Sequence, residues 1–547
     1  MTRTVTELLL TLEHTEDRGL RFEDQAISWA RHVSDSKIRS VALDSLLDPA
    51  EPRHFGVLMD NVPEFSLLAG AAALSGSVVV GLNTTRRGEA LADDIRVADC
   101  QIVFTEGRSA ALLEGLDLEV PVIDVGSDRW KNLLEQHDST PVTIAETTPD
   151  DLFMLIFTSG TSGKPKAVRC THEKIVGPGM MLAERFDLST SDVVYLAMPM
   201  FHSNAMMAGW SVALAAGTSV ALRRTFSASG FLSDVRKFEV TYANYVGKPL
   251  AYVLATPERP DDADNTLRLM YGNEGSARVV AEFARRFDAT VVEAFGSTEG
   301  GIAISSTPGK PPGALGLLPE SVRILDPETG AVCPPAVFDA DGRITNADEA
   351  TGELVNVTGS GSFAGYYGNP DADSERMRDG KYWSGDLGFC DSDGFVYFAG
   401  RSAGWLRVDG ENLGTAPIEH VLTRYPAFSQ VSVYGVPDTD VGDRVMAAVV
   451  LSPEHARAGF DAADFSRFLR DQPDLGPKQH PTFVRVSVEL PRTATFKIVT
   501  RTLSAERWNC ADPVWVRERG DAEFRLLQKP AVAMSVRELP AVFPSRE

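Results

Sequence analysis

The chain has 547 residues, 43% of them hydrophobic and 24% charged, which predicts two or more globular domains and argues against disorder. Its formal net charge of −23 at pH 7 argues against sequence-independent binding to nucleic acid, because that binding requires positive charge to displace counterions from phosphates. The five cysteines are scattered without a CxxC pair, so we expect reduced thiols in a cytoplasmic protein rather than a disulfide framework or a zinc site.

The N-terminus lacks a basic region followed by a long apolar stretch, so no secretory signal is expected. The nearest approach to a membrane span is the segment of residues 66–82, which has Ser and Gly residues in its middle. A helix ending at Ser75, followed by a strand at residues 78–80, explains this segment better than a bilayer crossing does. Peripheral contact with a membrane is left open.

In the N-terminal half, apolar runs with β-strand character alternate with helical patterns, which predicts α/β layers around mostly parallel sheets. These runs are residues 55–59, 78–82, 101–105, 120–125 and 192–198. From about residue 313 to residue 398 the pattern changes to short strands with many Gly, Asp and Pro turns. That pattern predicts a small antiparallel, β-barrel-like subdomain.

Beyond residue 400 the sequence predicts a compact α+β module. Its helices are expected at residues 416–425 and 461–470, and its strands at residues 431–436, 445–451 and 483–488. Small residues, Gly400, Ser402, Ala403 and Gly404, cluster around residues 401–404 and mark a boundary there. We therefore predict an N-terminal domain of residues 1–400, a C-terminal domain of residues 401–528, and a tail of residues 529–547.

The most informative motif is LIFTSGTSGKPKAVR at residues 155–169, where a buried strand runs into small and hydroxylic residues. Their hydroxyls and backbone N–H groups can form an anion-binding nest, and Lys164 and Lys166 add positive charge. The spacing excludes a Walker P-loop, because only two residues separate Gly160 from Gly163 and a proline follows the first lysine. The alternative is a Ser/Gly-rich surface loop with solvated lysines.

This motif resembles the phosphate loop of adenylate-forming enzymes, which include acyl-CoA synthetases, luciferases and peptide-synthetase adenylation domains. Two positions depart from the usual pattern: Ser162 replaces a threonine, and Ala167 replaces a final glycine as in the fatty-acid-transport-protein-like branch. The resemblance implies that this loop holds the β- and γ-phosphates of ATP. The residues it would use are Thr158, Ser159, Gly160, Thr161, Ser162, Gly163 and Lys166.

A second motif, EAFGSTEGG at residues 293–301, offers hydroxyl donors and a hard carboxylate of the kind that Mg²⁺ prefers. On its own it could equally be a glycine-bounded surface turn. It resembles the family's aromatic-Gly-x-Thr-Glu signature, which implies that Thr298 contacts the α-phosphate and Glu299 binds the metal. The ATP contacts implied here are Phe295, Gly296, Ser297 and Thr298.

Two further segments resemble parts of the family's binding site. The turn after the apolar strand near residue 270 resembles the adenine-lining segment, with Asn273, Glu274 and Gly275 as candidates; the alternative is a capped strand-to-helix turn. In the segment of residues 198–210, the resemblance places an aromatic-His pair beside the acyl carboxylate. The implied acyl pocket is Phe201, His202, Trp210 and Tyr245, and a catalytic duty for the histidine is the minority interpretation.

The motif YWSGDLG at residues 382–388 carries Asp386 where the family uses an aspartate to accept the ribose hydroxyls, and Arg401 matches an arginine that approaches the ribose. The family's hinge position holds Ala403, so no hinge side chain is named. Downstream, Lys497 matches the catalytic lysine, although an isolated lysine would more often be a solvated surface residue. The implied CoA-binding turn is Gly410, Glu411 and Asn412.

The resemblance covers roughly residues 20–525 and is closest to actinobacterial fatty-acid or steroid-side-chain CoA ligases. It implies an ATP-dependent, Mg²⁺-dependent ligase that forms an acyl-AMP from a lipid carboxylate and transfers the acyl group to CoA. It also implies that the C-terminal domain is mobile. Three alternatives stay open: a fatty-acyl-AMP ligase that loads a carrier protein, an aminoacyl-adenylating domain, and a non-catalytic nucleotide-binding or lipid-transport protein. The acid and the oligomeric state are not predicted.

Overall fold

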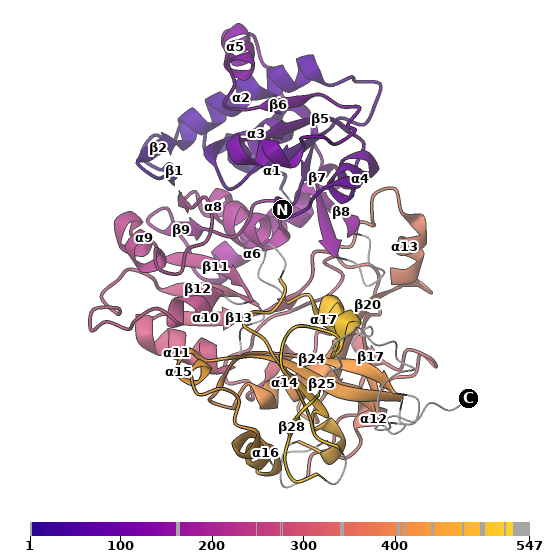
Figure 1. Cartoon of the computed structure of the whole chain (residues 1–547). Helices are drawn as coiled ribbons and strands as arrows, with labels where there is room; N and C mark the ends of the chain where they lie inside the picture. The colour runs from indigo at the N-terminus through magenta and orange to yellow at the C-terminus, as the bar shows by residue number, and fades with distance from the viewer. Residues whose placement is uncertain are drawn as a thin grey trace. The chain divides into compact units, whose positions relative to one another are not determined.

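The computed structural model describes residues 3–159, 165–247, 249–273, 275, 277–339, 344–401, 405–408, 411–438, 442–472, 475–492, 498–518 and 521–528. Figure 1 shows the helices and strands of the chain, coloured by residue number. The chain forms two compact units, each with its own hydrophobic cores. Among the described residues, unit 1 comprises residues up to Ala303 together with Ser360–Arg378, and unit 2 comprises Ile304–Gly359 and the residues from Asp379 onward.

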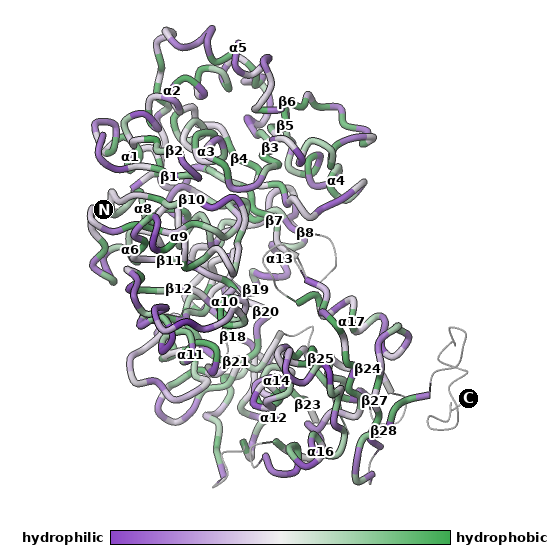
Figure 2. Tube along the Cα trace, turned by 60° about the vertical axis from the view of Figure 1, so that its left-hand side comes forward, coloured by the Kyte–Doolittle hydropathy of each residue, from purple (hydrophilic) through white to green (hydrophobic). Residues whose placement is uncertain are grey.

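The first sheet of unit 1 has six strands in the order β6-β5-β3-β4-β7-β8, all parallel except the antiparallel pair β7 and β8. Its strands are β3 (His54–Leu58), β4 (Val78–Gly81), β5 (Cys100–Thr105), β6 (Val122–Asp124), β7 (Leu152–Ser159) and β8 (Pro165–Thr171). The elements β3 and β4 are buried throughout, as expected for parallel strands covered on both faces, and the trace there is largely hydrophobic in Figure 2.

Helix α3 beside this sheet begins and ends at residues that favour helix termini. The element α3 has proline at its first position, where no N–H is needed, and ends at Gly76, whose φ of 66° favours glycine. Strand β4 follows, so the predicted helix and strand in residues 66–82 are confirmed. The elements are α1 (Val5–Leu10), α2 (Trp29–Leu46), α3 (Pro63–Ser75), α4 (Glu89–Val97), η1 (Gly107–Leu112) and α5 (Asp128–His137).

The second sheet of unit 1 has seven strands in the order β13-β12-β11-β9-β10-β1-β2, parallel except for the pair β1 and β2. Its strands are β1 (Gly19–Phe22), β2 (Gln25–Ser28), β9 (Val193–Leu196), β10 (Ser219–Leu222), β11 (Tyr242–Val246), β12 (Leu269–Asn273) and β13 (Thr290–Glu293). The helices are α6 (His172–Arg185), α7 (Ser203–Ala205), the π-helix η2 (Met206–Trp210), α8 (Ser211–Ala216), α9 (Phe231–Phe238), α10 (Pro249–Leu254) and α11 (Ala277–Phe287). The predicted α/β layers are therefore confirmed.

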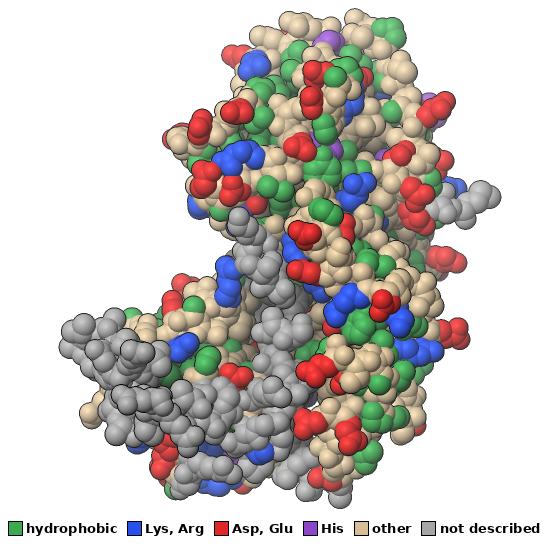
Figure 3. All heavy atoms as spheres, turned by 90° about the vertical axis from the view of Figure 1, so that its right-hand side faces the viewer, with side chains coloured by type: hydrophobic (Ala, Val, Ile, Leu, Met, Phe, Trp, Pro, Cys, Tyr) green, Lys and Arg blue, Asp and Glu red, His purple; other side chains and the backbone are tan. Residues whose placement is uncertain are grey.

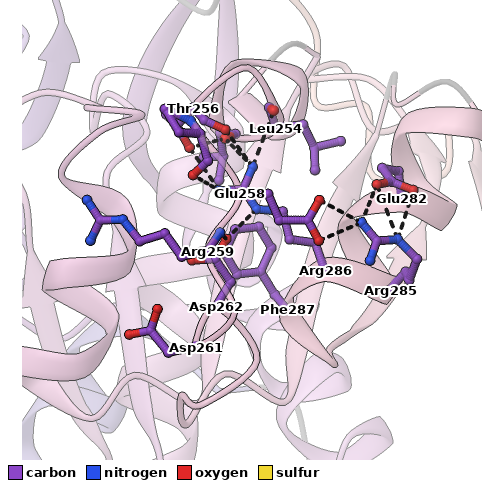
Figure 4. Close-up of polar contacts among 12 residues, drawn as sticks. Leu254, Thr256, Glu258, Arg259, Asp261, Asp262, Glu282, Arg285, Arg286 and Phe287 are labelled. Carbon is purple, nitrogen blue, oxygen red and sulfur yellow. Dashed lines mark hydrogen bonds and ion pairs between the residues drawn. The ribbon is translucent and has the colours of Figure 1, made fainter.

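A buried ion pair ties α11 to the loop that follows α10 (Figure 4). Arg286 is 6% exposed, and its Nε lies 2.6 Å from Asp262 Oδ2. Its guanidinium also donates to the carbonyls of Thr256 and Pro257 at 2.8 and 3.0 Å. The buried positive charge of Arg286 is therefore compensated by the Asp262 carboxylate and by backbone carbonyls. We interpret this cluster as structural.

Unit 2 contains an antiparallel sheet in the order β16-β21-β20-β18-β17, which confirms the predicted change to short antiparallel strands after residue 313. Register shifts in three of its strand pairs bend it, as in barrel-like sheets. The strands are β16 (Ala314–Leu317), β17 (Val322–Leu325), β18 (Gly352–Asn356), β20 (Lys381–Cys390) and β21 (Phe395–Arg401), and helix α12 spans Ala347–Ala350. Smaller elements of this part of the chain are β14 (Phe295–Gly296), β15 (Ala303–Ile304), α13 (Pro370–Arg376) and β19 (Met377–Arg378).

The C-terminal α+β module has the sheet order β23-β22-β25-β26-β27-β28, with β24 paired to β25. Its strands are β22 (Trp405–Val408), β23 (Glu411–Gly414), β24 (Phe428–Asp438), β25 (Gly442–Leu451), β26 (Phe483–Val486), β27 (Val514–Val516) and β28 (Arg525–Leu526). Its helices are α14 (Thr415–Leu422), α15 (Pro453–Ala456), α16 (Ala462–Arg470), η4 (Pro477–Gln479) and α17 (Thr500–Glu506). The predicted module is confirmed, whereas the functional boundary at residue 401 stays a prediction. The tail of residues 529–547 lies outside the described residues.

The surface carries both signs of charge. On the face shown in Figure 3, acidic side chains are spread widely, with lysine and arginine side chains interspersed among them. Within the described ranges, no helix is both long enough and apolar enough to cross a membrane.

Candidate functional site

The phosphate-loop motif sits at the tip of the β7–β8 hairpin. Strand register places Thr158 opposite Lys166 and Ser159 opposite Pro165. The connecting residues 160–164, which include Gly160, Thr161, Ser162 and Gly163, lie outside the described residues. Because a strand and not a helix follows the loop, the local architecture differs from a Walker P-loop, as the spacing predicted.

The structure brings the two predicted phosphate-binding motifs together within unit 1. The hydroxyl of Thr158 donates to Glu299 Oε1 at 3.3 Å, although the two residues are 141 positions apart. Thr298 Oγ1 shares a hydrogen bond of 2.8 Å with Ser203 Oγ, which comes from α7. The Thr-Glu pair is therefore held between the end of β7 and the segment that follows β9.

Glu299 receives a second hydrogen bond, which the sequence did not suggest. The Tyr366 hydroxyl donates to the same Oε1 at 3.2 Å. Burial, reinforced by the negative charge of Glu299, raises the pKa of Tyr366, so the hydroxyl keeps its proton and acts as a donor. Tyr366 reaches the site because its segment returns alongside β8, where Tyr366 bridges Val168. A lone tyrosine outside any motif offers no signal for this role.

Lys174, in the first turn of α6, is a further residue that sequence reasoning missed. The side chain of Thr171 caps the helix by accepting from the backbone N–H of Lys174 at 3.2 Å. The Lys174 ammonium is buried and donates to the backbone carbonyls of Glu299 at 2.8 Å and Arg169 at 3.3 Å. Burial lowers the pKa of Lys174.

Lys166, a predicted phosphate ligand, is already paired in this state. Its Nζ lies 2.9 Å from Glu375 Oε2, on α13, and 5.2 Å from the centroid of the Tyr366 ring. The bond from Lys166 lowers the pKa of the exposed Glu375 carboxyl. A phosphate would therefore compete with Glu375 for this ammonium, and the contact with ATP stays a prediction.

The predicted adenine segment begins at the C-terminal end of β12. The backbone N–H of Gly275 donates to Glu293 Oε1 at 2.6 Å, and an added Cβ on Gly275 would lie 2.6 Å from the same oxygen, so a larger residue would require the Glu293 side chain to shift. The side-chain oxygen of Asn273 is buried and has no hydrogen-bond partner among the described residues. A buried oxygen that lacks a partner is suited to accept a hydrogen bond from the exocyclic amine of adenine. Glu274 lies outside the described residues.

The predicted acyl-pocket residues come from β11 and the segment around η2. Phe201 is buried, with its ring 4.6 Å from that of His202. Burial lowers the pKa of His202 to about 4, so the ring is neutral at pH 7, and its Nε2 has no partner within the described part of the chain. Trp210 and Tyr245 are fully buried; the indole N–H donates to Ser66 at 2.9 Å and the phenol donates to Glu293 at 2.8 Å.

The predicted ribose-binding pair lies in unit 2. Asp386 on β20 and Arg401 on β21 are direct cross-strand partners in the register, so the two residues are neighbours. Asp386 is 7% exposed. The predicted CoA turn includes β23, in which Asn412 pairs with Arg407, although its side chain and Gly410 lie outside the described residues. The side chain of Glu411 and the whole of Lys497 are likewise not described.

The carboxylate of Glu299 fits a magnesium ion bound mainly by substrate. Among the described residues there is no group of three or more His, Cys, Asp or Glu side chains that could hold a metal. Mg²⁺ usually keeps several waters and is bound by one or two carboxylates together with phosphates, so a single carboxylate beside the phosphate loop is an appropriate donor. Among the described residues, no basic side chain forms an ion pair with the Glu299 carboxylate.

Comparison with known proteins assigns the class. The sequence matches the AMP-binding enzyme family over residues 13–367 and the AMP-binding enzyme C-terminal domain over residues 417–497. The chain belongs to the AMP-binding enzyme family. Its fold is also similar to that of the ATP-bound RpMatB-BxBclM chimera B3, with a TM-score of 0.78 at 23% identity over 93% of this chain and 99% of that one.

Two relatives are much more similar in sequence. A medium/long-chain-fatty-acid–CoA ligase of Mycobacterium tuberculosis, FadD17, is 54% identical over 94% of this chain and 98% of its own length. A steroid-22-oyl-CoA synthetase of Rhodococcus jostii is 45% identical over 93% of this chain and 92% of its own. The expected family and fold are thus confirmed.

Proposed function

We propose that this protein is an AMP-forming acyl-CoA ligase for a lipid carboxylate. The observation that carries the proposal is the meeting of Thr158, Thr298 and Glu299 at the end of β7, in a chain with close relatives named as CoA ligases. A carboxylate is a poor acyl donor because its leaving group would be oxide. Conversion to a mixed anhydride with AMP supplies a better leaving group.

In the first half-reaction, a carboxylate oxygen of the acid attacks the α-phosphorus of ATP in line with the bond to the β-phosphate. The new bond joins the carboxylate to AMP, and the electron pair of the broken bond leaves with pyrophosphate. Thr298 donates to an α-phosphate oxygen, and the phosphate-loop residues donate to the β- and γ-phosphates. Glu299 would hold a magnesium ion, which would supply neutralisation of phosphate charge. The protein's contribution is mainly positioning and electrostatic stabilisation.

Other residues orient the nucleotide and the acid. Asn273 accepts from the adenine amine, and Asp386 accepts from the ribose hydroxyls beside Arg401. Lys497 bridges the carboxylate and the α-phosphate. Lys497 belongs to the predicted C-terminal domain of residues 401–528. Rotation of that domain after the first half-reaction would move Lys497 away from the acyl-adenylate and make room for the attacking thiol.

In the second half-reaction, a CoA thiolate attacks the acyl carbonyl of the adenylate and AMP leaves with the bonding electrons. The turn at Gly410, Glu411 and Asn412 would border the incoming thiol after residues 401–528 rotate. Phe201, His202, Trp210 and Tyr245 would line the acyl pocket. We propose a long-chain fatty acid or a steroid side-chain acid as substrate, in the cytoplasm, with peripheral membrane contact as a further proposal.

Pyrophosphate release, measured with and without CoA across medium-chain, long-chain and steroid carboxylates, tests this function. We expect acid-dependent release and a thioester product only with CoA. Release without any thioester would instead favour a fatty-acyl-AMP ligase, and transfer to a carrier protein would identify it. If no carboxylate elicits release, the proposal fails.

The catalytic lysine has a separate test. Lys497→Ala should reduce adenylation far more than thioester formation from supplied acyl-adenylate, because the side chain contacts only the first transition state. Equal losses in the two half-reactions would contradict this assignment.

A further inference from the structure

The buried ammonium of Lys174 contacts the backbone of the Thr298-Glu299 motif. The side chain of Lys174 is 5% exposed, and its Nζ donates to the carbonyl oxygen of Glu299 at 2.8 Å. Within the part of the chain that the structure describes, no carboxylate lies within ion-pair distance of this nitrogen. The charge of Lys174 is therefore met by backbone carbonyls and not by a salt bridge.

The position of Lys174 is unfavourable for a lysine in two ways. Taking an ammonium out of water costs several kcal/mol even after relaxation. Lys174 also lies in the first turn of α6, where the helix dipole favours anions and disfavours cations. A neutral side chain would fill this space at a lower cost, so packing alone does not account for a lysine here.

The side chain of Lys174 packs against the turn that follows Glu299. The backbone N–H of Gly300 donates to the Ser297 carbonyl at 3.1 Å, and Gly300 has a φ of +74°, which favours glycine. A Cβ added to Gly300 would lie 3.3 Å from Lys174 Cε. The Lys174 side chain thus covers one side of the turn, and Thr158 and Tyr366 bond the Glu299 carboxylate.

We propose that Lys174 is a positioning residue that fixes the backbone of Glu299, so that its carboxylate is aimed at the metal–ATP complex. This inference rests on the proposed function, because it assigns Glu299 to magnesium. Groups that orient a metal ligand typically change metal affinity or activity by about 10- to 100-fold when they are removed. Lys174 touches neither substrate nor metal in this scheme and acts only through Glu299.

The test measures ATP binding without turnover. The rise in melting temperature caused by ATP is recorded as a function of Mg²⁺ concentration for the wild type, Lys174→Met and Lys174→Gln. We expect both variants to need about 10- to 100-fold more Mg²⁺ to reach half of the ATP effect. The glutamine variant keeps a polar group and carries the measurement if the methionine variant does not fold. An unchanged Mg²⁺ midpoint in a folded variant overturns the proposal.

A double-mutant cycle separates positioning from general destabilisation. In the Glu299→Gln background, Lys174→Met should shift the Mg²⁺ midpoint by less than about threefold, because residues that act through one another are not additive. A shift as large as in the wild-type background overturns the proposal. Lys237→Met removes an exposed lysine that pairs with Asp24 on the surface and should behave as the wild type.

The same experiment distinguishes failure of the proposed function. If the wild type shows no Mg²⁺-dependent stabilisation by ATP and no acid-dependent pyrophosphate release, the ligase proposal itself fails. If the wild type shows both and the Lys174 variants match it, only the positioning role fails.

Discussion

The hydroxyl groups of Thr158 and Tyr366 both donate to Glu299, the candidate metal ligand. Only one of these two residues belongs to a motif that the sequence reveals. Thr158 belongs to the phosphate-loop motif, and the family resemblance assigns it to ATP phosphates and Glu299 to the metal, although it does not predict the bond between them. Tyr366 and Lys174 belong to no motif, and their roles depend on how β8, α6 and the returning segment pack. Single residues that act through tertiary contacts carry no local pattern, which is why sequence reasoning could not find them.

Removal of the Tyr366 hydroxyl should weaken the site without disturbing its packing. In Tyr366→Phe the ring stays beside Lys166, but the 3.2 Å bond to Glu299 is lost. A hydrogen bond to a charged group contributes about 1.5 kcal/mol or more, so we expect the Mg²⁺ requirement for pyrophosphate release to rise about 10-fold.

The neighbouring tyrosine provides a matched control. The Tyr367 hydroxyl donates to Asp99 at 2.7 Å, so Tyr367→Phe removes the same group from a different partner. Its Mg²⁺ titration should match that of the wild type. Identical titrations for both phenylalanine variants would show that the Tyr366 hydroxyl does not support the carboxylate.

At the scale of elements, apolar runs that alternate with helical patterns predicted the α/β layers of unit 1 and the positions of some of its strands. The expected strands at residues 55–59, 78–82 and 101–105 correspond to β3, β4 and β5, because buried parallel strands are continuous apolar runs. Elements such as α17 and β28 were not predicted. They are short, and their positions depend on packing against the module's core rather than on their own periodicity.

The buried side-chain amide of Asn61 connects the segment after β3 with the segment after β9, and its role can be tested. Asn61 follows β3, donates to the Met198 carbonyl at 2.9 Å, and accepts from the Met200 N–H at 2.8 Å. Both partners lie just before Phe201, so this amide fixes the start of the predicted acyl-pocket segment. Sequence patterns predicted the two elements but not the side chain that joins them.

Asn61→Ala should therefore affect stability and acid binding together. Two buried backbone groups would lose their partners, at a cost of about 1–3 kcal/mol each, so we expect a lower urea midpoint. The KM for the acid should rise more than the KM for ATP. Ser45→Ala, which removes a hydroxyl bonded only within α2, serves as the control. Equal changes in the two KM values would contradict a local effect on the acyl segment.

At the scale of the whole molecule, a chain with a formal net charge of −23 also contains buried, neutral histidines in unit 1. Burial lowers the pKa of His32 to about 3 and of His172 to about 4. His172 Nδ1 accepts from the Val5 N–H at 3.2 Å, which requires an unprotonated nitrogen and joins α1 to α6. No motif predicts this, because the protonation state depends on burial.

Acidification should therefore destabilise the protein in a defined window. The folded-state pKa values lie below the ordinary value of 6.5, so the unfolded chain binds more protons between pH 6.5 and 4. The stability contributed by neutral His172 is fully present above pH 6.5 and is lost as the pH falls toward 4, by about 1.4 kcal/mol per pH unit. Urea unfolding followed by tryptophan fluorescence at pH 7, 6 and 5 measures this slope.

A variant that cannot titrate distinguishes this cause from the general repulsion of surface charges. His172→Gln keeps an acceptor for the Val5 N–H but takes up no proton, so its stability should fall less steeply between pH 7 and pH 5 than that of the wild type. His14→Gln changes a side chain that is 92% exposed, so its slope should equal that of the wild type. If the His172 variant retained the full slope, acid sensitivity would have to come from other groups, and the junction between α1 and α6 would not be its origin.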